Sequence, residues 1–332
     1  MKFKIKYSLL VFVLSISWIL NAQDPQFSQF YSSPIYMGPS FAGTGQGGRI
    51  IANYRDQWPR LTGTYVTYAL SGDYYFSKYR SGVGFLILRD DAGEGLLNTT
   101  NLGLNYSYNF DINRKWQFRP GLQAYYYMKN IDYSALQFGD QILRGGSGSS
   151  VEMSRLLTTT PTRHLDFSTS LLAYSDQIWI GFTLDHIMYF SKVLASQGDY
   201  LPFRISVYGG GKYNIYGRTR KLKEESVTGA FNLLLQDKYK YLDLGAYYTK
   251  EPAAIGLWYR GIPIFPDNPN LGAITLLFGY KFKAIRMGYS YDFTTSRLIT
   301  KTGGAHEISL TYSFKERTRK RVRHKIVPCP SI

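Results

Sequence analysis

Most of this chain, from about Arg49 to Phe314, is a succession of segments in which apolar and polar residues alternate. We count about fourteen such segments, separated by residues that favour turns. The last one is representative, with an apolar set and a polar set formed by Ile308, Leu310, Tyr312, Phe314 and Glu307, Ser309, Thr311, Ser313. Because successive side chains of a strand point to opposite faces, an alternation of period two predicts strands with one apolar and one polar face. The sequence therefore predicts an all-β fold.

The same alternation would suit a soluble β-sandwich, which is the alternative fold. Three features favour a barrel that spans a membrane instead. The segments approach the roughly 9–11 residues that a tilted strand needs to cross a bilayer. Many apolar faces end in Tyr, Phe or Trp, and aromatic residues make up 17% of the chain, as expected for the interfacial girdles of membrane barrels. The connections also alternate between short and long. The predicted fold is a transmembrane antiparallel β-barrel of about 14 strands.

The lengths of the connections indicate the orientation in the membrane. If the N-terminus lies in the periplasm, the turns on that side include the short residues 175–177 and 283–284. The opposite side then receives the long connections 131–163, 187–202 and 261–272. Short periplasmic turns and longer outer loops are the rule for outer-membrane barrels. An even number of strands also returns the C-terminus to the periplasm.

The polar faces carry many charges at membrane depth. A lysine or arginine that faced lipid at mid-bilayer would cost roughly 2–4 kcal/mol, so we expect these side chains to face the lumen, where opposite charges can pair. By the same reasoning, an arginine in place of Leu310 should hinder insertion, and an arginine in place of Ser309 should be tolerated. The predicted lumen charges are Arg49, Arg55, Asp73, Asp166, Asp185, Arg204, Asp243, Arg260, Arg286, Asp292 and Glu307.

The first 22 residues have the pattern of a secretory signal peptide. Three lysines lie among the first six residues, an apolar run follows at residues 8–20, and Ala22 is the small residue at the expected cleavage point. The alternative is a membrane anchor, but the run is shorter than the roughly 20 residues of a spanning helix. We therefore expect export through the periplasm to the outer membrane.

Two segments flank the predicted barrel at residues 49–314. Residues 23–48 are rich in Gln, Ser, Pro and Gly, and could plug the lumen or lie beneath it in the periplasm. Residues 315–332 form a basic periplasmic tail, with seven Lys or Arg and one Glu between Lys315 and Lys325. A run of like charges repels itself and is usually solvated, and the alternative is docking on an acidic partner.

The chain shows no pattern of an enzyme or a cofactor site. Its four histidines have no metal-ligand spacing, and His186 with Ser191 lacks the orienting third group of a catalytic pair. Cys329 is the only cysteine, so it forms no intrachain disulfide. The net charge of +16 could suggest nucleic acid, but the export signal argues against that partner. We expect no catalytic residue, no metal and no cofactor.

The long outer loops are the predicted place for a protein partner. Residues 131–163 are too long for a simple hairpin, and loops of such length are usually functional or disordered. Apolar side chains on exposed loops commonly mark binding surfaces. The alternative is that these loops fold inward and close the lumen. The candidate partner-binding residues are Tyr133, Leu136, Phe138, Leu143, Met188, Tyr189, Phe190, Ile262, Ile264 and Phe265.

Three short runs resemble a known family. Residues 24–30 read DPQFSQF, residues 39–43 read PSFAG, and residues 54–58 read YRDQW. In this order they resemble the opening of the PorP/SprF family of Bacteroidetes outer-membrane proteins, although Gly38 stands where family members often have Asn. Together with the length and the succession of strands, the resemblance covers nearly the whole mature chain.

The resemblance implies an accessory barrel of the type IX secretion system. Such a barrel would work with the trans-envelope machine or with a large surface protein, such as a gliding adhesin, by binding its C-terminal domain. The family has no known catalytic residues to carry over. Two other functions stay open, namely a porin or small-solute transporter and an outer-membrane enzyme. An open lumen would favour the transporter, whereas a lumen blocked by residues 23–48 would favour the binding barrel.

Overall fold

The computed structural model describes residues 24–45, 47–61, 63–93, 97–132, 162–188, 202–215, 225–237, 239–263, 272–295, 302–314 and 327–329. These residues form one sheet of fifteen strands, of which β5 has only two residues, and three short helices. The helices are η1 (Phe30–Ser32), α2 (Pro34–Met37) and η2 (Pro39–Phe41). The strands are β1 (Gly48–Gln57), β2 (Tyr65–Phe76), β3 (Ser81–Ala92), β4 (Leu97–Tyr108), β5 (Phe110–Asp111), β6 (Gln117–Ile131), β7 (Thr162–Tyr174), β8 (Ile178–Asp185), β9 (Arg204–Asn214), β10 (Glu225–Gln236), β11 (Tyr239–Lys250), β12 (Ala253–Pro263), β13 (Ala273–Phe282), β14 (Ile285–Thr294) and β15 (Ala305–Phe314).

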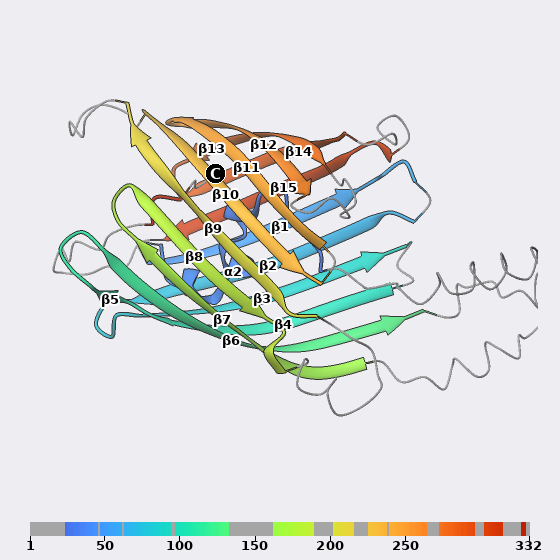
Figure 1. The fold of residues 1–332 in the computed structure, drawn as a ribbon, viewed down its shortest axis with the longest axis horizontal. Coiled ribbons are helices and arrows are strands. Elements are labelled where there is room, and N and C mark those ends of the chain that lie inside the picture. The colour runs from blue at the N-terminus through green and yellow to red at the C-terminus, as the bar shows by residue number, and fades with distance from the viewer. Residues whose placement is uncertain are drawn as a thin grey trace, which may run out of the picture.

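The sheet closes into a barrel of fourteen long antiparallel strands (Figure 1). Consecutive strands pair with each other, β1 pairs with β15 from Gly48↔Phe314 to Gln57↔Ala305, and β4 pairs with β6 across the short β5. Closure gives each of the fourteen long strands a neighbour on both sides, which a spanning sheet requires because lipid offers no hydrogen bonds. The predicted antiparallel barrel of about fourteen strands is therefore confirmed.

The two faces of the barrel are the reverse of those of a soluble sheet protein. In β15, Glu307 and Ser309 are buried inside, whereas Leu310 is 45% exposed on the outside. The same holds around the barrel, where the outward side chains are large and apolar and the buried inner ones are mostly polar or charged. A sandwich buries its apolar faces between its sheets, so the alternative of a soluble sandwich is wrong. An apolar outer band of this extent is the surface that a membrane barrel presents to lipid.

Among the residues described, no helix has the length and apolar character needed to cross a membrane. The helices that are present are single turns inside the barrel, where the N-terminal segment passes between the strands (Figure 1). Proline at the start of α2 and of η2 suits a first helical turn, because the missing N–H of proline would have no helical partner there.

Candidate functional site

Residues 24–45 lie inside the barrel, and we call them the plug segment. Helix η2 contacts β4, β6 and β7. Helix α2 contacts β3 and also the other two helices, η1 and η2. A segment without regular structure can be buried only when its backbone N–H and C=O groups find partners. Side chains on the polar inner face of the strands supply several of these partners, as for Ser28, Gln29 and Gly43. Around the plug segment the strand side chains form three clusters of charged residues and one cluster of aromatic residues.

The first cluster surrounds Ser28 and Gln29 and is centred on Glu307. The carboxylate of Glu307 accepts hydrogen bonds from the backbone N–H groups of Ser28 at 2.6 Å and Gln29 at 3.0 Å. The hydroxyl of Ser28 donates to Asp292 at 2.5 Å. Arg55 lies 3.0 Å from Asp292 and 3.4 Å from Glu307, and Arg260 lies 3.3 Å from Asp292. Two arginines and two carboxylates thus neutralise one another around the start of the plug segment.

The second cluster holds Asp24 through His186. The Nε2 atom of His186 lies 2.8 Å from Asp24, and its Nδ1 atom lies 3.0 Å from Asp166 and 2.8 Å from the hydroxyl of Tyr125. Burial alone would lower the pKa of His186, but the two carboxylates reverse this effect and raise it to about 10. Burial would likewise raise the pKa of Asp24, but His186 and Arg204 hold it well below its usual range. At neutral pH an imidazolium therefore joins the plug segment to β7 and β8.

The third cluster holds the end of the plug segment at Gly43. Asp73 accepts a hydrogen bond from the backbone N–H of Gly43 at 2.6 Å and pairs with Arg49 at 2.5 Å. Arg49 donates to the carbonyl of Phe41 at 3.0 Å, and Arg119 donates to the carbonyl of Gly43 at 3.1 Å. Gly43 has a φ of +69°, and a Cβ there would lie 2.7 Å from the backbone of β3, so this position requires glycine.

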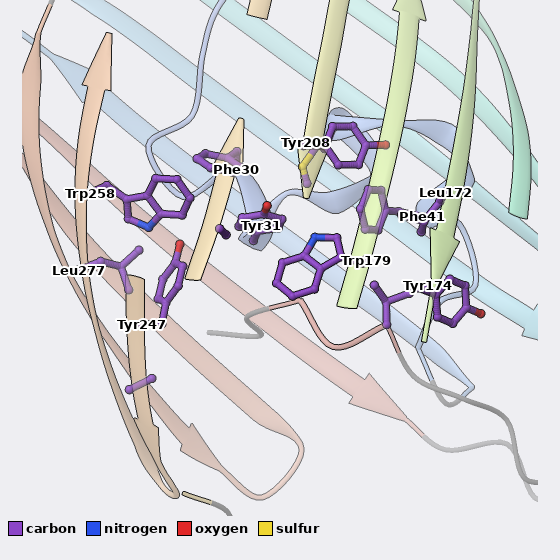
Figure 2. Packing of buried hydrophobic residues seen from close by; sticks show 14 residues of the cluster. Phe30, Tyr31, Phe41, Leu172, Tyr174, Trp179, Tyr208, Tyr247, Trp258 and Leu277 are labelled. Atoms are coloured by element: carbon purple, nitrogen blue, oxygen red, sulfur yellow. The ribbon is translucent and has the colours of Figure 1, made fainter. Parts of the chain in front are cut away.

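Between these polar clusters the plug segment packs against an aromatic core inside the barrel. Figure 2 shows Phe30 and Tyr31 between Trp258 and Trp179, with ring centroids 4.7 Å apart for Phe30–Trp258 and 5.8 Å for Tyr31–Trp179. Both pairs are edge-to-face, which is a favourable arrangement of two aromatic rings. The apolar contacts add to the hydrogen bonds, so the plug segment is held along its whole described length.

Two strand glycines mark where the plug backbone touches the wall. A Cβ on Gly121 in β6 would lie 2.2 Å from the backbone nitrogen of Ser40, and one on Gly82 in β3 would lie 2.0 Å from the carbonyl oxygen of Ala42. Both distances are far below van der Waals contact, so any side chain at these positions would displace the plug segment. Glycine within a strand often marks such a close approach of another backbone.

The predicted lumen charges all lie away from the outer face. Ten of them belong to or adjoin the clusters described above, in ion pairs such as Arg204–Asp185 at 2.8 Å and Arg260–Asp243 at 3.8 Å. The remaining one, Arg286, is half-buried and lines a cavity near Cys329. The ten are Arg49, Arg55, Asp73, Asp166, Asp185, Arg204, Asp243, Arg260, Asp292 and Glu307.

Most of the candidate partner-binding residues lie outside the described residues. Met188 and Ile262 are the two that the structure describes. Met188 is 39% exposed, and its backbone N–H donates to Asp166 at 3.0 Å, so the start of this outer connection is fixed to the barrel. Ile262 is half-buried at the end of β12. The other eight are Tyr133, Leu136, Phe138, Leu143, Tyr189, Phe190, Ile264 and Phe265.

The sequence does not reveal the plug-side partners of the lumen charges, among them Asp24, Ser28 and Gln29. Strand periodicity says which way a side chain of the wall points, but not which segment it will meet. The three runs that carry the family resemblance could have indicated these partners. Two of the runs lie in the plug segment, and the third includes Arg55, which pairs with Asp292. His186, set aside as a metal or catalytic residue, is instead an ion-pair partner of the plug.

Among the residues described, no group of three or more His, Cys, Asp or Glu side chains is arranged to hold a metal ion. The clusters are compensated pairs of acids and bases whose polar atoms are directed at the plug segment. What this arrangement does chemically is hold a peptide segment in the lumen.

Comparison with solved structures identifies other barrels of similar fold. The CymD monoaromatic hydrocarbon channel has a TM-score of 0.50 and 14% identity, over 86% of this chain and 94% of that chain. The outer membrane protein Omp33 of Acinetobacter baumannii has a TM-score of 0.44 and 9% identity, over 81% of this chain and 100% of that one. The toluene transporter TodX of P. putida has a TM-score of 0.44 and 10% identity, over 84% and 92%. At such identities the likeness concerns the fold alone.

A comparison with curated proteins found no match. The model of one protein family, described as type IX secretion system membrane protein PorP/SprF, matches residues 19–312. Membership of this family and the closed barrel with its apolar outer face confirm the predicted location in the outer membrane. Since the match spans most of the chain and includes the plug segment with all of the barrel but the last two residues of β15, the chain belongs to the PorP/SprF family of type IX secretion system membrane proteins.

Proposed function

We propose that this protein is a binding barrel of the type IX secretion system, which retains a large secreted surface protein, such as a gliding adhesin, by binding its C-terminal domain at the outer rim. The observation that carries the proposal is the filled lumen. The plug segment meets the inner wall from β3 and β4 round to β15 through the hydrogen bonds and aromatic contacts described above. A barrel filled in this way is suited to presenting a surface, and not to passing a solute.

The outer rim is the surface that we assign to the secreted partner. The connections 132–161, 186–203 and 264–272 leave β6, β8 and β12 at the same end of the barrel, because alternate strands of an antiparallel barrel end on the same side. They carry nine of the ten apolar residues expected to bind, with Met188 at the base of one connection, and the tenth, Ile262, lies at the end of β12. Hydrophobic anchors of this kind, presented from a rigid base, commonly dominate protein–protein binding.

Shortening the connection between β6 and β7 tests this function. A variant in which residues 133–161 are replaced by a short Gly/Ser linker should still insert and fold, since the strands pair directly over Gln117↔Tyr174 to Lys129↔Thr162. It should release the surface protein into the medium. The matched control replaces residues 216–224, on the periplasmic side between β9 and β10, by the same linker. Full retention of every surface protein by the first variant would contradict the proposal.

On the periplasmic side we assign the basic residues 315–325 to contact with acidic components of the secretion machinery. Exposed charges attract over about 8–10 Å at physiological ionic strength, so this contact should weaken as salt is raised. Replacing the seven basic residues by Gln should reduce co-purification of machinery components at low salt. If the same components are recovered without the charges, this contact does not exist.

A further inference from the structure

The C-terminal residues Val327, Pro328 and Cys329 return into the barrel. Val327 is 4% exposed and belongs to the same apolar cluster as Phe30, Trp179 and Trp258. Cys329 is half-buried and packs against that cluster. Figure 1 places this end of the described chain within the outline of the barrel, near β10 and β11. The expectation of a solvated tail concerned the basic run at residues 315–325, which lies outside the described residues.

The place where they lie is the periplasmic mouth of the barrel. Pro328 and Cys329 line one cavity with residues from the start of β10, the end of β11, the start of β12 and the end of β13. These strand ends are joined by the turns at residues 251–252 and 283–284, on the side assigned to the periplasm, and β15 also ends there, opposite the start of β1. From Phe314 the dozen residues 315–326 can span about 40 Å when extended, so the segment reaches this mouth from its own strand.

The cavity combines basic side chains with an adjoining apolar cluster. Its wall carries Lys212, Lys281 and Arg286 beside Glu251, which pairs with Lys281. The apolar side chain of Val327 packs into the aromatic cluster, and Pro328 and Cys329 line the cavity itself.

We propose that the periplasmic mouth of the barrel is a peptide-binding site, and that its occupant is the C-terminal Val327-Pro328-Cys329 segment of the same chain. The bound segment lies on the periplasmic side of Tyr31 and Trp179 and closes the lumen at that end. The plug segment fills the lumen further inside the barrel. The proposal concerns the periplasmic end and is independent of the partner proposed for the outer rim.

Disulfide trapping tests the position of the segment. Ala254 is buried, faces inward at the start of β12 and lines the same cavity as Cys329, whereas its neighbour Ile255 is 57% exposed and faces lipid. With a mild oxidant, Ala254→Cys should form an intrachain disulfide with Cys329 in the folded full-length barrel. The matched control Ile255→Cys should form none. Equal crosslinking of the two variants, or none with Ala254→Cys, would overturn the proposal.

Thiol labelling gives a second and independent measurement. Burial raises the pKa of Cys329 to about 11, and the surrounding residues restrict access to it, so a maleimide should react with it slowly in the folded protein. Val327→Asp should speed the reaction tenfold or more, because a buried carboxylate would expel the segment, whereas Val327→Leu should not. The proposal fails if the folded wild-type protein reacts as fast as the urea-unfolded protein.

Discussion

At the scale of single residues, the lumen depends on buried charges that compensate each other. Glu307 is fully buried, receives two backbone N–H groups of the plug segment and lies beside Arg55. Removing one partner of a buried pair leaves the other charge without compensation, which costs about 3–5 kcal/mol. The free energy of unfolding should therefore be far more sensitive to these residues than to ion pairs at the rim.

Glu307→Ala should lower the free energy of unfolding by about 3–5 kcal/mol and loosen the start of the plug segment. The control is Glu225→Ala, because Glu225 pairs at 3.7 Å with Lys250, whose side chain is 63% exposed, and exposed pairs contribute about 1 kcal/mol or less. Urea unfolding of both variants in the same lipid, followed by tryptophan fluorescence, measures the difference. Similar losses for the two variants would mean that Glu307 is not an anchor.

The His186 pair should give the plug a defined dependence on pH. The pKa of His186 is raised from 6.5 to about 10, so its contribution to stability is complete below pH 6.5 and is lost as the pH rises through 10. The pKa of Asp24 is lowered, so its contribution is present above its ordinary pKa and is lost only in strong acid.

His186→Gln should accordingly destabilise the folded protein most at pH 5–6, less at pH 8, and hardly at all above about pH 10.5. Trp179 and Trp258 contact the plug segment, so their fluorescence during urea unfolding reports the change. A loss of stability that is the same at every pH would show that His186 carries no buried charge.

At the scale of elements, each strand has one face toward lipid and one face toward the plug segment, and the two faces tolerate different substitutions. The sequence suggested that an arginine would be tolerated at Ser309. In the structure Ser309 is 1% exposed, and its hydroxyl donates to Gln29 at 2.7 Å. That expectation is wrong, because the lumen at this level holds the plug segment instead of water.

On the lipid side of the same strand, Leu310→Arg should prevent or slow insertion, because an arginine facing lipid near mid-bilayer costs roughly 2–4 kcal/mol. Leu310→Phe keeps the side chain apolar and should insert normally. The folded fraction in vesicles, read from the shift in gel mobility between heated and unheated samples, distinguishes the two. Equal folded fractions would place Leu310 away from the lipid.

At the scale of the whole molecule, the fold combines a membrane barrel with an internal peptide that fills it. The apolar residues face out to lipid, and the polar residues face in and bind the plug segment, so the inner wall acts as a receptor for the chain's own N-terminal segment. This arrangement predicts that the barrel conducts poorly in spite of its fourteen long strands.

Gly121→Val should open the barrel. Its side chain would meet the backbone of Ser40, from which a Cβ would be only 2.2 Å away, and should push the plug segment aside. The control is Gly229→Val, because a Cβ at Gly229 meets no atom within 4 Å. In planar bilayers the wild type and the control should stay closed, and the first variant should show single-channel currents. An open wild-type channel would favour the porin alternative instead.

The sequence by itself determined the strands of the barrel and which of their faces is apolar. Alternation over about ten residues predicted about fourteen antiparallel strands and the faces of residues such as Glu307 and Leu310, because a strand has only two faces and lipid accepts only one kind of side chain. The family resemblance likewise needed only short runs of residues.

Only the tertiary structure decided what fills the lumen of the barrel. The plug segment has no periodicity, and several of its partners are more than two hundred residues away, as for Ser28 and Glu307. Such contacts depend on where fourteen tilted strands bring their polar faces together, and no local pattern encodes that. The position of Val327 follows the same rule. The aromatic cluster that Val327 contacts exists only once the barrel has closed, so the sequence near Val327 does not reveal this contact.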